Sequence, residues 1–318
     1  MVHLVCALTA VLTLSGAPSK KAQKPWQWSI DRVKQISRVV APGQNLTPKR
    51  WPGNTRVAVA LSFDLDNETP RLRDNRTSPA VIAQGQYGSR AGLPRILPLL
   101  RKHRIPVTFF MPAVIAELYP ASVKAIVKDG HEVGIHGWIH ERNSRLTEAE
   151  ERLLMGRALD RLQKITGKRP VGIRTPSWDF SPHTLKLIQE FGLLYDSSLM
   201  ADDRPYELLS HGKRTGVVEL PVEWILDDYP YFGFSRYAAI RPHIGPEAVL
   251  DIWKKEFDGA YRERTLFVLT MHPHIIGHRS RMDILARLIR YIKRHKGVWF
   301  ATHEAIARVA KRQMTTKK

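Results

Sequence analysis

Apolar, strand-like runs alternate with amphipathic helical patterns from residue 55 onward, and this alternation constrains the fold of the 318-residue chain more than any other feature. The predicted strands cover residues 56–66, 105–112, 131–136, 171–176, 194–200, 217–226, 266–273 and 297–302. The predicted helices cover residues 92–103, 119–130, 147–167, 181–192, 246–263, 280–295 and 303–312. Strands and helices in this order are typical of a parallel sheet covered by helices. Seven or eight such units in one chain predict the α/β class and favour a closed (β/α) barrel over an open sheet.

The chain divides into four predicted segments: residues 1–17, 18–54, 55–305 and 306–318. The first contains an apolar run of signal-peptide length that ends in a small-x-small site, but it lacks a basic residue before the run. Residues 1–17 are therefore a possible signal peptide or a disordered start, with a mis-assigned start and a docked terminal helix as further alternatives. Export to the periplasm or cell envelope and a cytoplasmic location both stay open. Residues 18–54 are expected to be a linker or N-terminal extension, residues 55–305 the catalytic barrel, and residues 306–318 a basic tail.

The chain carries a formal net charge of +20, with basic residues gathered near both ends. This is consistent with solvated termini, or with attraction to an anionic cell wall or membrane surface. No helix-turn-helix, zinc-finger or aromatic-basic signature points to a specific nucleic-acid partner. No phosphate-binding glycine loop follows a predicted strand, which argues against nucleotide binding. The single cysteine, Cys6, excludes an intrachain disulfide and a cysteine-based zinc site. The oligomeric state is not readable from the sequence.

Polar side chains stand at the carboxyl ends of several predicted strands, where parallel barrels place their chemistry. The first strand ends in Asp64-Leu65-Asp66, and the two aspartates point the same way in an extended chain. His136 ends the third strand and His140 follows four residues later, with Gly134 and Gly137 allowing the backbone to bend. Two imidazoles and one carboxylate form a three-ligand set with an open position, which is the pattern of a catalytic metal site.

Three further strand ends supply candidate functional groups. Arg174 near the two aspartates is expected to lower a carboxylate pKa and to hold its orientation. His272, which follows four apolar residues, is a candidate general acid. His131 lies near a strand start, so we expect it at the opposite end of the barrel in a structural role.

A second group of residues is expected to contact the substrate. Glu223 stands on a predicted strand and is a candidate substrate-binding residue. Trp138, Trp178 and Trp224 are candidates for a groove on which sugar rings stack, although core packing explains tryptophans equally well.

The motifs SFDLDNE, HGWIHE, RTPSW and LTMHP, in this order and at these separations, resemble the polysaccharide deacetylase superfamily, which includes chitooligosaccharide and peptidoglycan deacetylases. The resemblance covers roughly residues 55–305. It implies a distorted (β/α)7-8 barrel and one divalent metal ion, with Zn²⁺ the usual ion, although the donor set also suits other first-row ions. By motif, the resemblance implies that Asp66, His136 and His140 are ligands and Asp64 the catalytic base. It also implies that Arg174 orients that base and that His272 protonates the leaving nitrogen.

Three departures from the common family pattern leave the substrate open. Leu65 separates the two aspartates, Gly137 replaces the usual hydroxyl residue, and the family's fourth motif is not clearly present. These features look like a branch with both peptidoglycan deacetylase-like members and members that hydrolyse cyclic amides or imides. The departures also leave open how Asp64 and Asp66 divide the roles of base and ligand.

The main hypothesis is therefore a metal-dependent hydrolase of non-peptide C–N bonds that removes acetyl groups from an N-acetylated sugar polymer. The alternatives are hydrolysis of a small cyclic amide at the same site, and a non-catalytic carbohydrate-binding barrel.

Overall fold

Strand β2, Val57–Asp64, is the centre of the sheet and is buried along its whole length. It pairs in parallel with β3 (Thr108–Met111), β9 (Leu266–Met271) and β10 (Val298–Phe300). A parallel strand of a barrel has neighbours on both edges, the packed interior on one face and helices on the other, so it must be apolar on both faces, which the run of Val, Ala, Leu and Phe provides. The first predicted strand is thus confirmed.

The computed structural model describes residues 23–234 and 244–314 of the chain. The chain forms two units, residues 1–37 and 38–318. In the first unit, the 3₁₀ turn Pro25–Gln27 precedes helix α1, Ile30–Ser37. The predicted signal segment, residues 1–17, lies outside the described residues.

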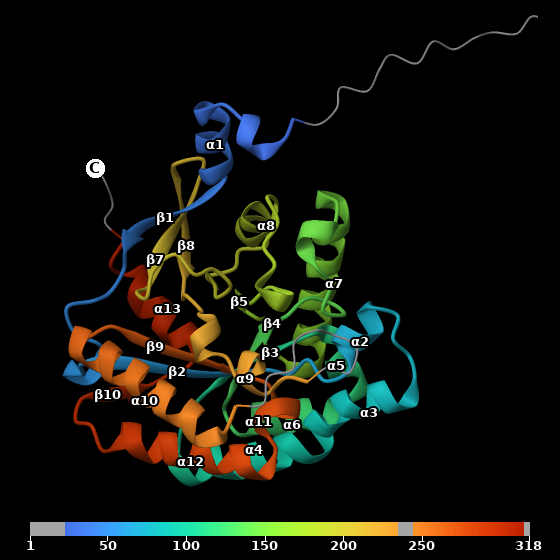
Figure 1. Ribbon diagram of the computed structural model, residues 1–318, viewed down its shortest axis with the longest axis vertical. Coiled ribbons are helices and arrows are strands. Elements are labelled where there is room, and N and C mark those ends of the chain that lie inside the picture. The colour runs from blue at the N-terminus through green and yellow to red at the C-terminus, as the bar shows by residue number, and fades with distance from the viewer. Residues whose placement is uncertain (1–22, 235–243, 315–318) are drawn as a thin grey trace, which may run out of the picture. The chain divides into compact units, whose positions relative to one another are not determined.

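The second unit contains one sheet with the strand order β1-β7-β8-β6-β5-β4-β3-β2-β10, and β9 pairs with β2 (Figure 1). The strands not yet given are β1 (Val40–Asn45), β4 (Glu132–Ile135), β5 (Gly172–Ile173), β6 (Tyr195–Asp196), β7 (Tyr206–Ser210) and β8 (Lys213–Glu219). All pairs are parallel except β1–β7 and β7–β8. The segment after β8 approaches β9 through a single bridge between Asp227 and Thr270. The sheet therefore curls into a distorted barrel, and the predicted α/β barrel is confirmed.

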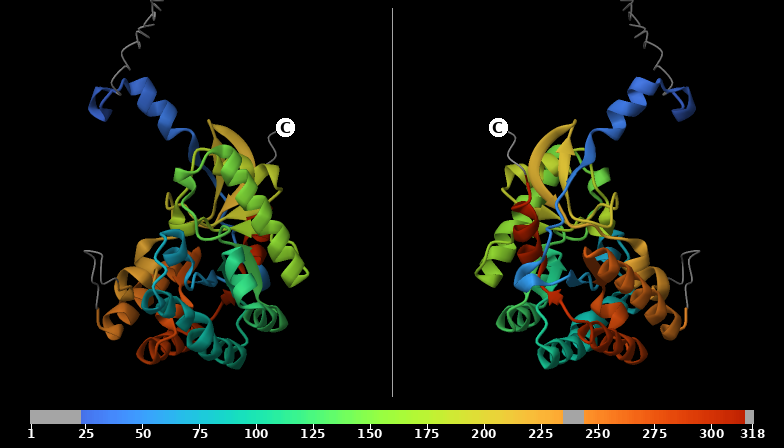
Figure 2. Two further views of the ribbon diagram at one scale, coloured as in Figure 1. Left: turned by 90° about the vertical axis from the view of Figure 1, so that its right-hand side faces the viewer. Right: turned by 90° about the vertical axis from the view of Figure 1, so that its left-hand side faces the viewer.

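Helices cover the outside of the curled sheet, and Figure 2 shows them from two further sides. Helices α4, α10 and α12 pack against one another, and α5, α6 and α7 form a second group. The helices of this unit are α2 (Thr69–Arg73), α3 (Pro79–Tyr87), α4 (Leu93–His103), α5 (Ala113–Leu118), α6 (Pro120–Lys128), α7 (Glu148–Thr166), α8 (Thr184–Glu190), α9 (Tyr229–Phe232), α10 (Pro246–Glu263), α11 (Pro273–Ile276), α12 (Arg279–Lys293) and α13 (His303–Lys311). Short 3₁₀ or π turns cover Pro52–Asn54, Gly88–Gly92, Asn143–Arg145, Pro176–Trp178 and Trp224–Leu226. None of the helices within the described ranges is long and apolar enough to cross a bilayer.

The structure corrects two predicted boundaries. Residues 40–45, inside the predicted linker, form β1, which pairs antiparallel with β7. Residues 306–311, inside the predicted basic tail, complete α13, whose apolar side is buried against the sheet. The helix predicted over residues 303–312 is thus confirmed, and the buried Ile306, Ala307 and Ala310 hold it in place.

The predicted strand over residues 217–226 is also wrong in its bounds. Strand β8 begins at Lys213 as the second arm of a hairpin, whose turn residues His211 and Gly212 both have positive φ. Such values suit a two-residue turn between antiparallel strands. The strand ends at Glu219, shortly before Pro221, which has no N–H to donate to a ladder. Trp224–Leu226 instead forms a 3₁₀ turn.

Gly172→Ala tests how tightly the short strand β5 is packed. A Cβ at this position meets the buried ring of Tyr195 on the neighbouring strand, so we expect the free energy of unfolding to fall by about 1–3 kcal/mol. Gly259→Ala in α10 is the matched control, because its Cβ meets only Arg262 at 3.9 Å. Urea unfolding of both variants measures the effect. Equal stability of the two variants would contradict the packing argument.

Candidate active site

Asp64 and Asp66 leave the end of β2 on the same side and line one cavity. Both carboxylates are almost fully buried. The backbone N–H of Leu65 donates to Phe110 O at 2.8 Å, so the chain stays in register with β3 as far as this residue. Asn67 then takes a positive φ, and its side chain donates to Ser89 Oγ at 2.6 Å. The turn therefore follows directly after the two carboxylates and fixes them at the end of the strand.

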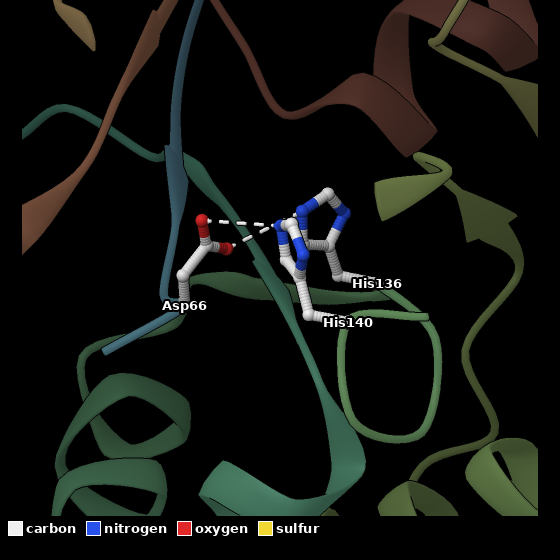
Figure 3. A group of neighbouring side chains, drawn as sticks. All are labelled: Asp66, His136 and His140. Atoms are coloured by element: carbon white, nitrogen blue, oxygen red, sulfur yellow. Dashed lines mark ion pairs between the residues drawn. The ribbon is translucent and has the colours of Figure 1, made fainter. Parts of the chain in front are cut away.

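The loop after β4 brings two imidazoles to Asp66, as Figure 3 shows. His136 Nε2 lies 3.3 Å from Asp66 Oδ1, and His140 Nε2 lies 3.3 Å from Asp66 Oδ2. Gly137 and His140 both have positive φ, which folds the loop back on itself. The Glu141 carboxylate accepts from the backbone N–H groups of Trp138 and Ile139 and closes this fold. A Cβ on Gly137 would press on Pro176 and Glu141, which explains why this position holds glycine.

The donor set of Asp66, His136 and His140 fits a divalent metal ion. One ligand atom from each residue lies within 4.8 Å of the others, and all three residues are buried. Asp66 Oδ1 is buried without a hydrogen-bond partner among the described residues. His136 Nδ1 donates to Arg174 O at 2.7 Å, which leaves the lone pair of Nε2 facing Asp66. A metal-binding histidine is held by such a hydrogen bond from its other nitrogen.

The second imidazole, His140, has a different neighbour. Arg73 Nη1 lies 2.9 Å from His140 Nδ1 and 3.0 Å from the carbonyl oxygen of the same residue. Because arginine only donates, the first contact favours the tautomer with its proton on Nε2. Binding a cation through Nε2 therefore requires the proton to move to Nδ1, with Arg73 retained by the carbonyl oxygen.

The charges of this group keep the carboxylate ionised. Burial by itself would raise the pKa of Asp66, but His140 and His136 outweigh burial and hold this pKa well below its usual value. Burial lowers the pKa of His140, so that its imidazole tends to the neutral form. An ionised carboxylate and a neutral imidazole are the forms that a metal ion needs. Burial would lower the pKa of His136, but Asp64 and Asp66 outweigh burial and raise it, so a metal ion bound at His136 would displace a proton.

Arg174, which follows β5, is fully buried and holds Asp64. Its Nη1 donates to Asp64 Oδ1 at 2.8 Å and to Ser62 Oγ at 2.9 Å. Its Nε and Nη2 donate to the carbonyl and hydroxyl oxygens of Ser197, each at 3.0 Å. The guanidinium also lies 4.2 Å from the centre of the Phe110 ring. These contacts fix Asp64 Oδ1, so Oδ2 is the oxygen that faces His136, at 3.9 Å from Nε2.

His272 stands at the end of β9 and points its Nε2 toward Asp66 Oδ2, at 3.7 Å. Its Nδ1 lies 2.7 Å from Asp228 Oδ1, and its backbone N–H donates to Asp228 Oδ2 at 3.0 Å. Asp227 Oδ1 lies 3.5 Å from the same Nδ1. Burial would lower the pKa of His272, but Asp227 and Asp228 outweigh burial and raise this pKa well above its usual value. The imidazole therefore stays protonated at neutral pH.

Asp227 and Asp228 were not predicted from the sequence, although a signal was present. Both follow the segment that was assigned as a strand over residues 217–226. The rule that polar groups at strand ends carry the chemistry would have pointed to them. The prediction considered the histidines and the four motifs, so this acidic pair was assigned no role.

These groups line one cavity of about 460 Å³, a size typical of small-molecule and cofactor sites. Asp64, Asp66, His136, His140 and His272 all line it. Trp178 and Trp224 line it as well, with ring centres 4.0 Å apart in a stacked arrangement.

The structure corrects the expected place of two residues. Trp138 lies under Arg157, 3.7 Å from the centre of the tryptophan ring, and lines a different cavity beside α7. Glu223 lines another cavity with Glu256, in the segment between the end of β8 at Glu219 and the 3₁₀ turn Trp224–Leu226. His131 is buried at the start of β4 and lines a cavity away from the other histidines, as expected for the opposite end of the barrel.

Comparison with known proteins identifies the family. The sequence model for polysaccharide deacetylase matches residues 74–195. A peptidoglycan deacetylase from Helicobacter pylori is 31% identical over 278 residues, which cover 79% of this chain and 95% of that protein. The chain belongs to the polysaccharide deacetylase family. This family member is accordingly a hydrolase of non-peptide carbon–nitrogen bonds, as predicted.

Solved structures extend the likeness of this family member over the whole barrel. A polysaccharide deacetylase-type structure from Mycobacterium smegmatis is 33% identical, with a TM-score of 0.79 over 88% of this chain and 99% of that chain. The structure of Puue allantoinase is 28% identical, with a TM-score of 0.71 over 84% of this chain and 93% of that chain. The same fold therefore occurs in proteins named as deacetylases and in one named as an allantoinase.

Asp228→Asn tests the electrostatic pairing of His272. The substitution removes the carboxylate that contacts His272 Nδ1 and helps to raise its pKa, so this pKa falls. The protonated imidazole is then lost at lower pH, and the alkaline limb of the pH–rate profile should move to lower pH. Pairing of protonated His272 with its aspartates also adds to the free energy of unfolding. This contribution is complete below the ordinary histidine pKa of about 6.5 and is lost as pH rises through the raised pKa of His272 in the folded protein.

The profile of Asp228→Asn is compared with that of Asp160→Asn on α7, which removes a carboxylate from a different cavity. An NMR titration of the His272 ring gives the pKa directly. An alkaline limb and a ring titration that stay in place would contradict the assigned pairing.

Proposed function

We propose that this family member is a metal-dependent N-deacetylase of an N-acetylated sugar polymer of the peptidoglycan type. The observation that carries the proposal is the buried group of Asp66, His136 and His140, which shares one cavity with Asp64 and His272. The peptidoglycan deacetylase name of the Helicobacter pylori relative supports this class of substrate. A binding-only barrel would have no use for a metal-type donor set beside a fixed carboxylate and a protonated imidazole.

A divalent ion held by Asp66, His136 and His140 would supply a Lewis acid that activates water and polarises the amide carbonyl. Asp64, with Oδ1 fixed by Arg174, is placed to accept the water proton through Oδ2. His272, with Nδ1 engaged by Asp228, is placed to give the proton on Nε2 to the departing nitrogen. Water and the amide are consumed, the C–N bond breaks, and acetate and a free amine result. The Trp178–Trp224 stack at the cavity wall offers an aromatic face to a sugar ring.

A second candidate is hydrolysis of a cyclic amide or imide by the same groups. The likeness to Puue allantoinase supports it, as do the departures from the common deacetylase motifs. The two candidates differ in their products. An acetylated glycan releases acetate, whereas a cyclic amide opens its ring without releasing acetate.

His136→Ala and His272→Ala test the proposed division of roles. His136→Ala removes a ligand, so we expect metal content and hydrolysis to fall together. His272→Ala removes the proton donor, so we expect normal metal content and a rate about 10²–10⁴-fold lower. Elemental analysis, acetate release from N-acetylglucosamine oligomers and ring opening of hydantoin are measured on the same samples. Normal turnover of metal-free His136→Ala, or a full rate in His272→Ala, would contradict the roles assigned here.

A further inference from the structure

One wall of the active-site cavity carries four arginines. Arg71, Arg73, Arg76 and Arg142 all line it. The carboxylates of the same cavity are already engaged: Asp64 by Arg174, Asp74 by Arg73, and Asp66 and Asp227 by histidines. The four lining arginines match the four lining aspartates in number, and Arg174, which is not part of the lining, adds a further positive charge beside Asp64. A cavity with this balance attracts anionic groups.

Arg71 on α2 lines the cavity five residues after Asp66. Asp66 and Arg76 both act electrostatically on its guanidinium. The side chain is half-buried, and its Nη1 donates only weakly, to Asn67 O at 3.3 Å. Among the described residues, no carboxylate lies within ion-pair distance of it. A desolvated guanidinium without a carboxylate partner is a strong site for a planar anion.

His274 on α11 stands in the same corner and carries a second, independent sign of a ligand. Its side chain is only 4% exposed, and neither ring nitrogen has a hydrogen-bond partner in the part of the chain that the structure describes. The residue lines the cavity, and the charge of Arg71 acts on its ring. Buried polar groups of native proteins are almost always paired, so a histidine left open to a cavity indicates a partner that arrives with the ligand.

Arg71 and His274 also mark the junction of two cavities. A neighbouring cavity of about 410 Å³ shares both residues, together with Gln84, with the active-site cavity. Tyr87 and Phe232 line its far part. A group bound between Arg71 and His274 thus sits beside the reacting centre and has room to continue away from it.

We propose that Arg71 and His274 form a subsite for a carboxylate carried by the substrate next to the amide that is hydrolysed. The guanidinium donates to both carboxylate oxygens, and the imidazole donates its one N–H. One cation and one neutral ring match a single negative charge, which favours a carboxylate over a doubly charged phosphate. The inference deepens the proposed function, on which it rests, by selecting acidic N-acetyl sugars over neutral ones. The same chemistry would serve a cyclic amide that bears a carboxylate.

The test compares substrates that differ in the acidic group. N-acetylglucosamine oligomers are neutral, whereas oligomers with N-acetylmuramic acid units carry a carboxylate. Dihydrouracil and dihydroorotate form the same contrast among cyclic amides. We expect the wild-type chain to prefer the acidic member of whichever pair it hydrolyses. Arg71→Met should raise KM for the acidic member by about 10- to 100-fold and leave KM for the neutral member unchanged.

Two variants and one control separate recognition from folding. Arg71→Lys keeps the charge but not the planar fork, so it should restore only part of the preference. His274→Leu should weaken the same preference with little change in kcat for the neutral member. Arg157→Met is the control, because it removes an arginine from the separate cavity beside Trp138. Equal losses for both members of a pair in Arg71→Met, or a wild-type chain without preference, would overturn the subsite.

Direct binding distinguishes failure of this inference from failure of the proposed function. Calorimetric titration of the wild-type chain and Arg71→Met with N-acetylmuramic acid and N-acetylglucosamine needs no turnover. Tighter binding of the acidic sugar that Arg71→Met abolishes would support the subsite even if no acetate were released, in which case only the proposed activity would fail. Equal binding of the two sugars would refute the subsite even in an active deacetylase.

Discussion

The active site depends on compensating two neighbouring carboxylates that are buried at the end of one strand. Desolvation of this kind strongly favours the neutral acid, so each charge needs its own compensation. Asp64 obtains it from the buried guanidinium of Arg174, and Asp66 from two imidazoles. The compensating groups come from different strands of the barrel, so the fold must be complete before either carboxylate is stable as an anion. The chemistry and the tertiary structure are therefore specified by the same contacts.

The same logic separates the roles of otherwise similar side chains. At His140, burial outweighs the charge of Asp66 and lowers the pKa, whereas His272 faces Asp227 and Asp228 as well and its pKa is raised. That difference in surrounding charge, and not in residue type, leaves one imidazole protonated and another neutral. Arg174 and Arg71 also differ in their surroundings. Arg174 is enclosed by hydrogen-bond acceptors of the protein, whereas Arg71 donates weakly to Asn67 O and has no carboxylate partner among the described residues. Arg174 therefore holds other residues of the protein in place, and Arg71 is the arginine that we propose for recognition of the substrate carboxylate.

Much of this arrangement was predictable from the sequence, because residues at the carboxyl ends of the strands of a parallel barrel meet at one end of the barrel. Asp64, Asp66, His136, Arg174 and His272 lie at or just beyond strand ends, and all gather at one end of the barrel. His140 follows because glycine allows the loop to turn. The rule failed where the strand itself was misjudged: β8 ends at Glu219, Glu223 lines a different cavity, and Asp227 and Asp228 lie beside His272. It also could not show His274, whose significance lies in missing partners, a property that exists only in three dimensions.

The bridge between Asp227 and Thr270 has a consequence beyond closure of the sheet. It joins the segment after β8 to β9 two residues before His272, and the Asp228 N–H donates to Thr270 O at 3.2 Å. The contact that closes the barrel and the two carboxylates beside His272 thus belong to the same segment, Asp227 and Asp228. Local opening of this contact would uncouple His272 from its acidic partners while leaving the Asp66 cluster on β2 and β4 intact. His272 would then lose the contacts that raise its pKa, whereas the contacts of Asp66 with His136 and His140 would remain.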